Sequence, residues 1–237
     1  MATKPSRGAF IVIEGLDRSG KSTQAATLLE RLQSRNIPVK FHKFPDRVTP
    51  IGQMIDSYLR SKSDLDDHVI HLLFSANRWE LAATVEQTLN SGTHIVCDRY
   101  AFSGIAFTAS KPSQIPFEWC RTPDISLPAP DLILYLDISP NKAKERGGYG
   151  EERYEQEEMQ TRVREVYRRM REETMAVGSN RESENRPQWV EIDAGRSVED
   201  VGKEIWIHVE PFVQPSGISK PIGRLWMDRL PSAGVTL

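Results

Sequence analysis

Residues 8–24 place a strand pattern, a glycine loop and a helix pattern in immediate succession, and this order constrains the fold more than any other feature. The apolar run Phe10–Ile13 leads into the motif Gly15-x4-Gly20-Lys21-Ser22, and a helical pattern begins directly after it. A strand, a glycine loop and a helix in this order are typical of the phosphate-binding loop of α/β nucleotide-binding proteins. The segment therefore predicts that the chain binds a nucleoside triphosphate.

Each residue type in this loop has a chemical reason. Gly15 and Gly20 let the backbone pass close to a polyphosphate with its N–H groups turned inward. Lys21 supplies a positive charge for the β- and γ-phosphates, and Ser22 offers a hydroxyl group to Mg²⁺. The N-terminus of the following helix adds a favourable dipole for the bound anion.

The composition excludes several classes of protein. A chain of 237 residues is long enough for one α/β domain. Its formal net charge of −2 argues against a general nucleic-acid binder or a basic membrane-surface protein. No segment approaches the ~20 apolar residues of a membrane span. The two cysteines, Cys97 and Cys120, lack metal-ligand spacing and are typical of buried thiols in a reducing compartment. We therefore expect a cytoplasmic protein, with a nuclear pool as a further expectation, and no nucleic-acid or membrane partner.

Strand and helix patterns alternate along the chain. Five short segments have strand patterns: Phe10–Ile13, Val39–Phe44, His94–Cys97, Leu132–Leu136 and Trp189–Ile192. Four segments have helix patterns: Ser22–Ser34, Ile51–Arg60, Asp66–Leu89 and Gln160–Met175. A last helix pattern begins at a capping box at Ser197 and runs through Val209. This alternation predicts a doubly wound, five-stranded parallel sheet with helices on both faces. Ligands of such sheets lie beyond the carboxyl ends of the strands.

Three segments fall outside this alternation. We expect one domain over residues 1–237, with a glycine-rich lid around 146–155 that has arginine near both ends. Residues 178–187 have the composition of an inserted surface loop, and a partly ordered tail begins at about residue 211. A flexible surface loop stays an alternative for the glycine-rich segment.

Further candidate side chains follow the second and third strands. Asp98 and Arg99 come directly after the third strand, where an acid can hold a metal's water shell and an arginine can bind a second phosphate. Arg47 follows the second strand, although an ordinary turn with one solvated arginine is the alternative. Phe74 and Arg78 are four apart on a helix, so they share a face that suits a nucleobase. Core packing plus a surface charge would explain the same pair.

Three classes of phosphate-loop protein compete. A regulatory GTPase requires Asn-Lys-x-Asp, whereas residues 141–144 are Asn-Lys-Ala-Lys. A motor or transport ATPase is usually larger and has an acidic pair after an apolar strand. A small kinase fits one compact domain with spare arginines and aromatic residues for a second nucleotide.

Longer motifs resemble those of the thymidylate kinase family, particularly its eukaryotic type. The similar segments are Phe-Ile-Val-Ile-Glu-Gly-Leu-Asp-Arg-Ser-Gly-Lys-Ser-Thr-Gln from residue 10, Phe-Pro-Asp-Arg from 44, His-Leu-Leu-Phe-Ser-Ala-Asn-Arg-Trp from 71, Asp-Arg-Tyr-Ala-Phe-Ser-Gly-Ile-Ala-Phe from 98, Glu-Arg-Tyr-Glu from 152 and Lys-Pro-Ile-Gly-Arg-Leu-Trp from 220. The Asp-Arg-Tyr block is the most specific of them, because many kinases share a phosphate loop. The family implies the architecture of phosphate-loop nucleoside monophosphate kinases.

The resemblance implies a phosphoryl transfer from ATP to dTMP that gives dTDP and ADP, a step of dTTP synthesis for DNA. It implies catalytic roles for Arg18, Lys21 and Arg99, and Mg²⁺ held through Ser22 and Asp98. ATP would be bound by residues of the loop and by two distant arginines: Gly15, Arg18, Ser19, Gly20, Lys21, Ser22, Thr23, Arg146 and Arg196. The dTMP pocket would be formed by Asp17, Phe44, Pro45, Arg47, Phe74, Arg78, Arg99, Tyr100, Ser103, Gly104, Phe107 and Tyr154. The family also implies a homodimer.

Two alternatives to this function stay open. One is a nucleoside monophosphate kinase with another pyrimidine acceptor, and the other is a catalytically silent nucleotide-binding protein. One residue departs from the family pattern, because Asp46 stands where glutamate is common, and this shortens the side chain beside Arg47.

Overall fold

The computed structural model describes residues 6–146, 153–154, 156–175, 186–214 and 216–227. Most of the expected lid and of the expected insertion at 178–187 therefore lie outside the described residues. None of the helices in these ranges combines the length and the apolarity that a membrane span requires.

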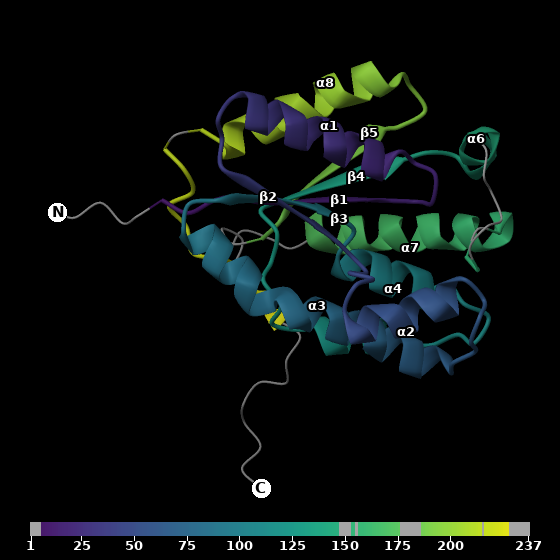
Figure 1. The fold of residues 1–237 in the computed structure, drawn as a ribbon. Coiled ribbons are helices and arrows are strands. Elements are labelled where there is room, and N and C mark those ends of the chain that lie inside the picture. The colour runs from purple at the N-terminus through teal and green to yellow at the C-terminus, as the bar shows by residue number, and fades with distance from the viewer. Residues whose placement is uncertain (1–5, 147–152, 155, 176–185, 215, 228–237) are drawn as a thin grey trace, which may run out of the picture.

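A five-stranded parallel sheet forms the centre of the molecule, as the alternation of patterns predicts (Figure 1). Its strands are β1 (Phe10–Gly15), β2 (Val39–Lys43), β3 (His94–Asp98), β4 (Leu132–Asp137) and β5 (Gln188–Asp193). Their order across the sheet is β2-β3-β1-β4-β5, and every neighbouring pair is parallel. The central strands are buried on both faces, which explains why their sequences are nearly continuous apolar runs.

Helices cover both faces of the sheet. They are α1 (Lys21–Ser34), α2 (Pro50–Leu59), α3 (Asp67–Asn90), α4 (Ala101–Ala109), α5 (Phe117–Arg121), α6 (Pro140–Glu145), α7 (Glu157–Met175) and α8 (Val198–Val209), with short 3₁₀ turns η1 (Thr122–Asp124) and η3 (Glu210–Phe212). Helices α1 and α8 pack together on one face, whereas α3, α4 and α7 lie on the other (Figure 1). Helix α2 packs against α3, outside the layer that touches the sheet.

Most element boundaries agree with the sequence patterns to within a few residues. Ser197 caps α8 as expected, since its hydroxyl accepts from the Asp200 backbone N–H at 3.1 Å. No sequence pattern predicts α4, α5 or α6. Residues Ala101–Thr108 of α4 are all buried, so the helix has no polar face and its sequence has no amphipathic period.

Residues 218–226 form a segment that we call the C-terminal strap. Its Ile218 exchanges backbone hydrogen bonds with Arg7 at 3.1 and 3.2 Å, and the Arg7 side chain donates to the Lys220 carbonyl at 2.8 Å. The Arg7 guanidinium also binds both carboxylate oxygens of buried Asp131. Further along, the Leu225 carbonyl accepts from the Ser126 backbone N–H at 3.0 Å. The strap thus joins the first described residues to the loop that precedes β4.

Candidate active site

One cavity of about 870 Å³ opens where the carboxyl ends of β1, β2 and β3 meet. Apart from Gly15, every site residue predicted from the sequence lines it. The charged side chains in the lining are six arginines and two lysines against two aspartates: Arg18, Arg47, Arg78, Arg99, Arg146, Arg196, Lys21 and Lys43, with Asp17 and Asp98. A chain with a net charge of −2 therefore concentrates positive charge in one hollow, which suits a polyanionic ligand.

The loop between β1 and α1 forms one wall of this cavity. Gly20 ends the loop in the left-handed region at φ 94, a conformation that glycine adopts without strain. Lys21 is 5% exposed and donates to the Leu16 carbonyl across the loop. Burial, together with the positive charge of Arg99, lowers the pKa of Lys21 to about 7. An anionic phosphate would favour the charged form of this ammonium group.

Gly15 is the predicted site residue that does not line the cavity. It closes β1 outside the cavity lining, and a Cβ atom there would lie 2.6 Å from the Leu136 carbonyl oxygen of β4. The residue therefore allows β1 and β4 to approach closely just before the loop begins.

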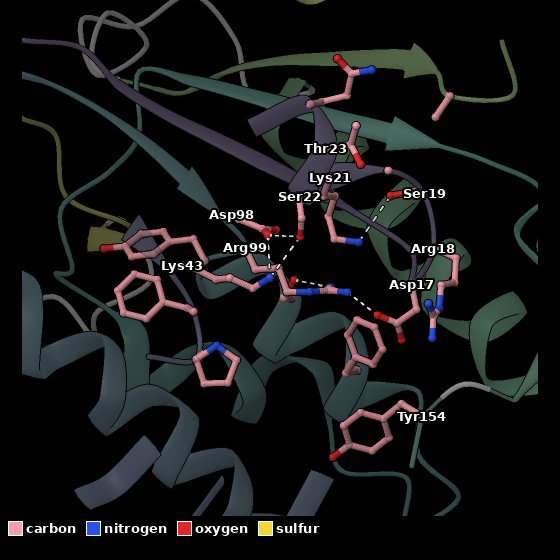
Figure 2. A pocket seen from close by; sticks show the side chains of 18 of the residues that line it. Asp17, Arg18, Ser19, Lys21, Ser22, Thr23, Lys43, Asp98, Arg99 and Tyr154 are labelled. Carbon is pink, nitrogen blue, oxygen red and sulfur yellow. Dashed lines mark hydrogen bonds and ion pairs between the residues drawn. The ribbon is translucent and has the colours of Figure 1, made fainter. Parts of the chain in front are cut away.

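Asp98, Ser22 and Lys43 form a cluster beside the loop (Figure 2). The Ser22 hydroxyl donates to Asp98 Oδ2 at 2.6 Å, and the Lys43 ammonium lies 3.1 Å from the same oxygen. Although Asp98 is buried, the positive charges of Lys21, Arg99 and Lys43 hold its pKa below the usual value, so the carboxylate is ionised. Its Oδ1 atom is buried and has no hydrogen-bond partner among the described residues.

This cluster has the chemistry that Mg²⁺ requires. A buried anionic oxygen without a partner and a serine hydroxyl are hard oxygen ligands, and Mg²⁺ is commonly held by one or two such groups plus phosphates and water. The described residues contain no group of three or more His, Cys, Asp or Glu side chains that could hold a metal by themselves. The donor set therefore fits a cation that arrives with a nucleotide.

Arg99 stands at the centre of the site. It follows β3 with a left-handed φ of 68, and its guanidinium pairs with Asp17 from the phosphate loop (Figure 2). The same group donates to the Ser103 hydroxyl at 3.1 Å and lies 5.2 Å from the Phe107 ring. Asp17 is held from the other side by Gln160 of α7, whose amide nitrogen donates to Asp17 Oδ2 at 2.8 Å. These contacts fix two predicted site residues against each other.

A buried carboxylate, that of Glu14, binds the Ser103 hydroxyl that contacts Arg99. Glu14 of β1 is fully buried and accepts from the Ser103 hydroxyl at 2.6 Å, the Tyr167 hydroxyl at 2.7 Å and the Tyr100 backbone N–H at 2.8 Å. Burial raises the pKa of Glu14, although the hydrogen bond from Ser103 and the charge of Arg99 oppose the shift. The network connects β1, α4 and α7 directly beneath the cavity.

Aromatic side chains and a buried arginine form the opposite end of the cavity. Phe74 and Arg78 both line it, as their four-residue spacing on α3 predicts, and Phe107 contacts Tyr154 at 5.5 Å between ring centroids. Arg78 is only 2% exposed, and its Nε and Nη2 atoms donate to Asp124 at 3.0 and 2.6 Å. The Tyr100 hydroxyl points away to the Pro128 carbonyl at 3.1 Å, so this residue contributes to the wall mainly through its ring and backbone.

The remaining predicted arginines lie at the rim. Arg47 pairs with Asp56 of α2 at 2.6 Å. Arg146 donates to the Arg18 carbonyl at 3.1 Å, which places it over the phosphate loop. Arg196 pairs with Glu204 of α8, on the side of the cavity that Val198 and Val201 also line.

Several residues of the site are not among those that the sequence predicts. Glu14, Lys43, Asp124, Gln160 and Tyr167 all contact predicted site residues. Two of them carried a local signal, since Glu14 is an acid inside an apolar strand and Lys43 directly precedes Phe44 at a strand's carboxyl end. The other three come from distant segments, where nothing in the local pattern indicates a partner.

Comparisons with known proteins agree with this geometry. A family model described as thymidylate kinase matches residues 13–205. The chain is 49% identical to the thymidylate kinase of Arabidopsis thaliana over 95% of its length and 79% of that protein's. It is 44% identical to the thymidylate kinase of Danio rerio and 41% identical to that of Homo sapiens, in both cases over 93% of this chain and 98% of the relative.

A solved structure extends the likeness to the fold. The structure of thymidylate kinase from Candida albicans superposes with a TM-score of 0.77 at 35% sequence identity, covering 93% of this chain and 99% of the other. The family model spans residues 13–205 and the relatives are similar over most of the chain, so the chain belongs to the thymidylate kinase family.

Proposed function

We infer that the chain transfers the γ-phosphoryl group of ATP to dTMP and releases dTDP and ADP, a step of dTTP synthesis. The observation that carries this inference is the single cavity whose lining joins the phosphate loop at one end to Phe74 and Arg78 at the other. A donor triphosphate at the loop and an acceptor base beside Phe74 would share one hollow. The thymidylate kinases to which the chain is similar support the choice of acceptor.

The reaction needs little help from a base, because the attacking oxygen of a nucleoside monophosphate is already anionic. The barrier comes from bringing two anions together and from the charge that spreads over the transferring group. Lys21, Arg99 and Arg18 line the cavity around the loop, so their positive charges would neutralise this anion in a closed site. We assign them the catalytic roles for this reason.

We propose that Ser22 and Asp98 hold Mg²⁺ with the donor triphosphate, directly or through water. The ion would supply charge neutralisation between the β- and γ-phosphates. Lys43 contacts both Ser22 and Asp98, at 3.1 Å each, and therefore brings a second cation to the same place. The carboxylate of Asp98 balances the positive charges around it.

We propose that the acceptor occupies the region between Arg99 and Arg78. Its phosphate would lie near Arg47 and Arg99, its sugar near Asp17 and its base beside Phe74. The pairs that Arg99 forms with Asp17 and Arg47 forms with Asp56 hold both guanidinium groups at the cavity. The lining contributed by Phe44, Pro45, Tyr100, Ser103, Gly104, Phe107 and Tyr154 completes this region. The ATP side would include Ser19, Gly20, Thr23, Arg146 and Arg196.

We further propose that two copies of the chain associate through α2 and α3. Val69, Leu72 and Trp79 recur on one face of α3 and are 45%, 47% and 42% exposed, and Met54 of α2 is 50% exposed. Covering this apolar face would remove it from water and would leave the cavity open at the strand ends.

We expect the enzyme in the cytoplasm, and a nuclear pool stays a prediction.

The test of the reaction is ADP release from Mg·ATP with a panel of acceptors: dTMP, dUMP, dCMP, UMP, CMP and AMP. We expect strong turnover with dTMP, weaker turnover with dUMP and little with the others. A preference for a cytidine or uridine ribonucleotide would keep a kinase but overturn the acceptor. Absence of turnover with every acceptor, despite ATP binding, would overturn the catalytic assignment.

A further inference from the structure

Asp124 is a buried acid close to the base end of the cavity. It ends the η1 turn, is 0% exposed, and receives three hydrogen bonds on its two oxygens. Oδ1 accepts from the Ser75 hydroxyl at 2.8 Å and from Arg78 Nε at 3.0 Å, and Oδ2 accepts from Arg78 Nη2 at 2.6 Å. This two-point contact fixes both the position and the plane of the Arg78 guanidinium.

A glycine lies directly beside the same guanidinium. A Cβ atom at Gly104 of α4 would lie 2.9 Å from Arg78 Nη2 and 3.2 Å from Nη1, so the group rests against bare helix backbone. Both Gly104 and Arg78 line the cavity. With Nε and one N–H of Nη2 engaged by Asp124, the N–H groups of Nη1 and the second N–H of Nη2 are left to donate to a ligand.

The turn that carries Asp124 is itself tied to α3. The Pro123 carbonyl accepts from the Ser75 hydroxyl at 3.0 Å and from the Trp79 indole N–H at 2.8 Å. The Leu127 backbone N–H donates to the Asp124 carbonyl at 3.2 Å. The acid and the arginine are therefore held in one frame by contacts between the turn and α3.

The ion pair between Arg78 and Asp124 also offsets a positive charge at the base end of the cavity. An unpaired arginine at the base end would attract phosphate as strongly as the cations around the phosphate loop do, so a nucleotide could bind in either direction. Pairing with Asp124 offsets the charge of Arg78, whereas the lining around the phosphate loop keeps more cations than anions, so phosphate is attracted more strongly to that end. What Arg78 retains is a directed N–H donor.

We propose that Asp124 is a positioning residue for base recognition: it orients Arg78 as a donor toward a base carbonyl and prevents it from acting as a phosphate site. This inference rests on the proposed kinase function. A thymine presents a carbonyl on its outer edge, whereas a cytosine presents an amino group there, and a fixed donor rejects the amino group. Asp124 thereby contributes to the choice of acceptor without touching it.

The test is steady-state kinetics of Asp124→Asn with dTMP and dCMP. We expect the KM for dTMP to rise about 10- to 100-fold and the preference for dTMP over dCMP to narrow. The kcat should stay within about threefold, and the KM for ATP should not change, because the phosphate loop is untouched. Ser75→Ala, which removes one hydrogen bond and no charge, is the matched control and should raise the KM less than about threefold.

A second pair of variants separates positioning from a general effect on structure. In an Arg78→Met background, Asp124→Asn should leave the KM for dTMP unchanged, because the residue acts only through the guanidinium. An equal rise in both backgrounds would overturn the proposal. If Asp124→Asn does not fold, Gly104→Ala keeps the ion pair but displaces the guanidinium, and a normal KM and selectivity in that variant would overturn the proposal as well.

Failure of this inference is distinguishable from failure of the proposed function. A wild-type protein that does not phosphorylate dTMP would remove the function itself. A wild-type protein that does so, beside an Asp124→Asn variant with unchanged KM and selectivity, would remove only the role of Asp124.

Discussion

Replacement of Arg18 gives the sharpest test of the catalytic assignment. Arg18 lies in the phosphate loop beside Asp17 (Figure 2). Its backbone has a left-handed φ of 62, a conformation that costs an L-residue about 1 kcal/mol and glycine nothing. Arg18→Ala therefore removes the guanidinium and keeps the strain, whereas Arg18→Gly removes both.

The two variants should share one kinetic defect and differ in stability. Loss of a cation that acts on the transferring phosphoryl group should lower kcat about 10²- to 10³-fold, which corresponds to roughly 3–4 kcal/mol. The KM for dTMP should change less than about threefold, since the charge is needed in the transition state rather than for binding. Arg18→Gly should unfold at a higher temperature than Arg18→Ala, because the glycine relieves about 1 kcal/mol of backbone strain.

The assay is coupled ADP release at saturating Mg·ATP and dTMP, with thermal unfolding measured on the same samples. Asn36, whose φ is 56 and whose side chain is exposed, offers a matched control away from the cavity. Comparison of Asn36→Ala with Asn36→Gly measures the strain alone and should leave kcat unchanged. Turnover of Arg18→Gly within tenfold of the wild type would refute the catalytic role of Arg18.

Three further outcomes are expected. Burial lowers the pKa of His71 to about 4, below its ordinary value of about 6.5. As the pH falls, the unfolded chain therefore takes up this proton before the folded chain does, and the stability that is present above pH 6.5 is lost toward pH 4. In denaturant unfolding, the free energy of unfolding of the wild type should fall by roughly 2 kcal/mol more than that of His71→Gln between pH 7 and 5. An equal loss of unfolding free energy in the wild type and in His71→Gln over this pH range would contradict the expectation. Asp98→Asn should raise the Mg²⁺ concentration for half-maximal activity about 10- to 100-fold, and an unchanged Mg²⁺ titration would remove the residue from the metal site. In sedimentation, Leu72→Glu should give monomers, whereas Ile207→Glu, which changes an exposed residue on α8, should not; a dimer in both would place the interface elsewhere.

The sheet could be predicted from the sequence because the pattern that indicates each strand lies within the residues of that strand. A strand that is buried on both faces must be an apolar run, and β1, β3 and β4 are such strands. The edge strands β2 and β5 are only partly buried, and they lie where the other two strand patterns are found. The phosphate loop is local for the same reason, since its glycines, lysine and serine act through their own backbone and their nearest neighbours. Helix α4 is the counter-example: it is buried all round, so it lacks the polar face by which an amphipathic helix is recognised.

The supporting residues of the site could not be predicted because their partners are far away in sequence. Asp124 lies 46 residues from Arg78, and Gln160 lies 143 residues from Asp17. The packing of α7 against α4 and β5, and of η1 against α3, brings these groups together. Local patterns therefore indicate which side chains meet the ligand, whereas the fold decides which side chains hold them in place.

The C-terminal strap sets the order in which the molecule can be completed. The hydrogen bond from Arg7 to Lys220 joins residues 213 positions apart, so it cannot form until nearly the whole chain has been synthesised. The strap also supplies the Leu225 carbonyl to Ser126, two residues after Asp124. Every residue assigned to the donor and acceptor sites precedes the strap in the sequence, since the last of them is Arg196. A chain cut before residue 218 would thus keep all the groups of the site but lose the contacts that hold Arg7 and the loop before β4.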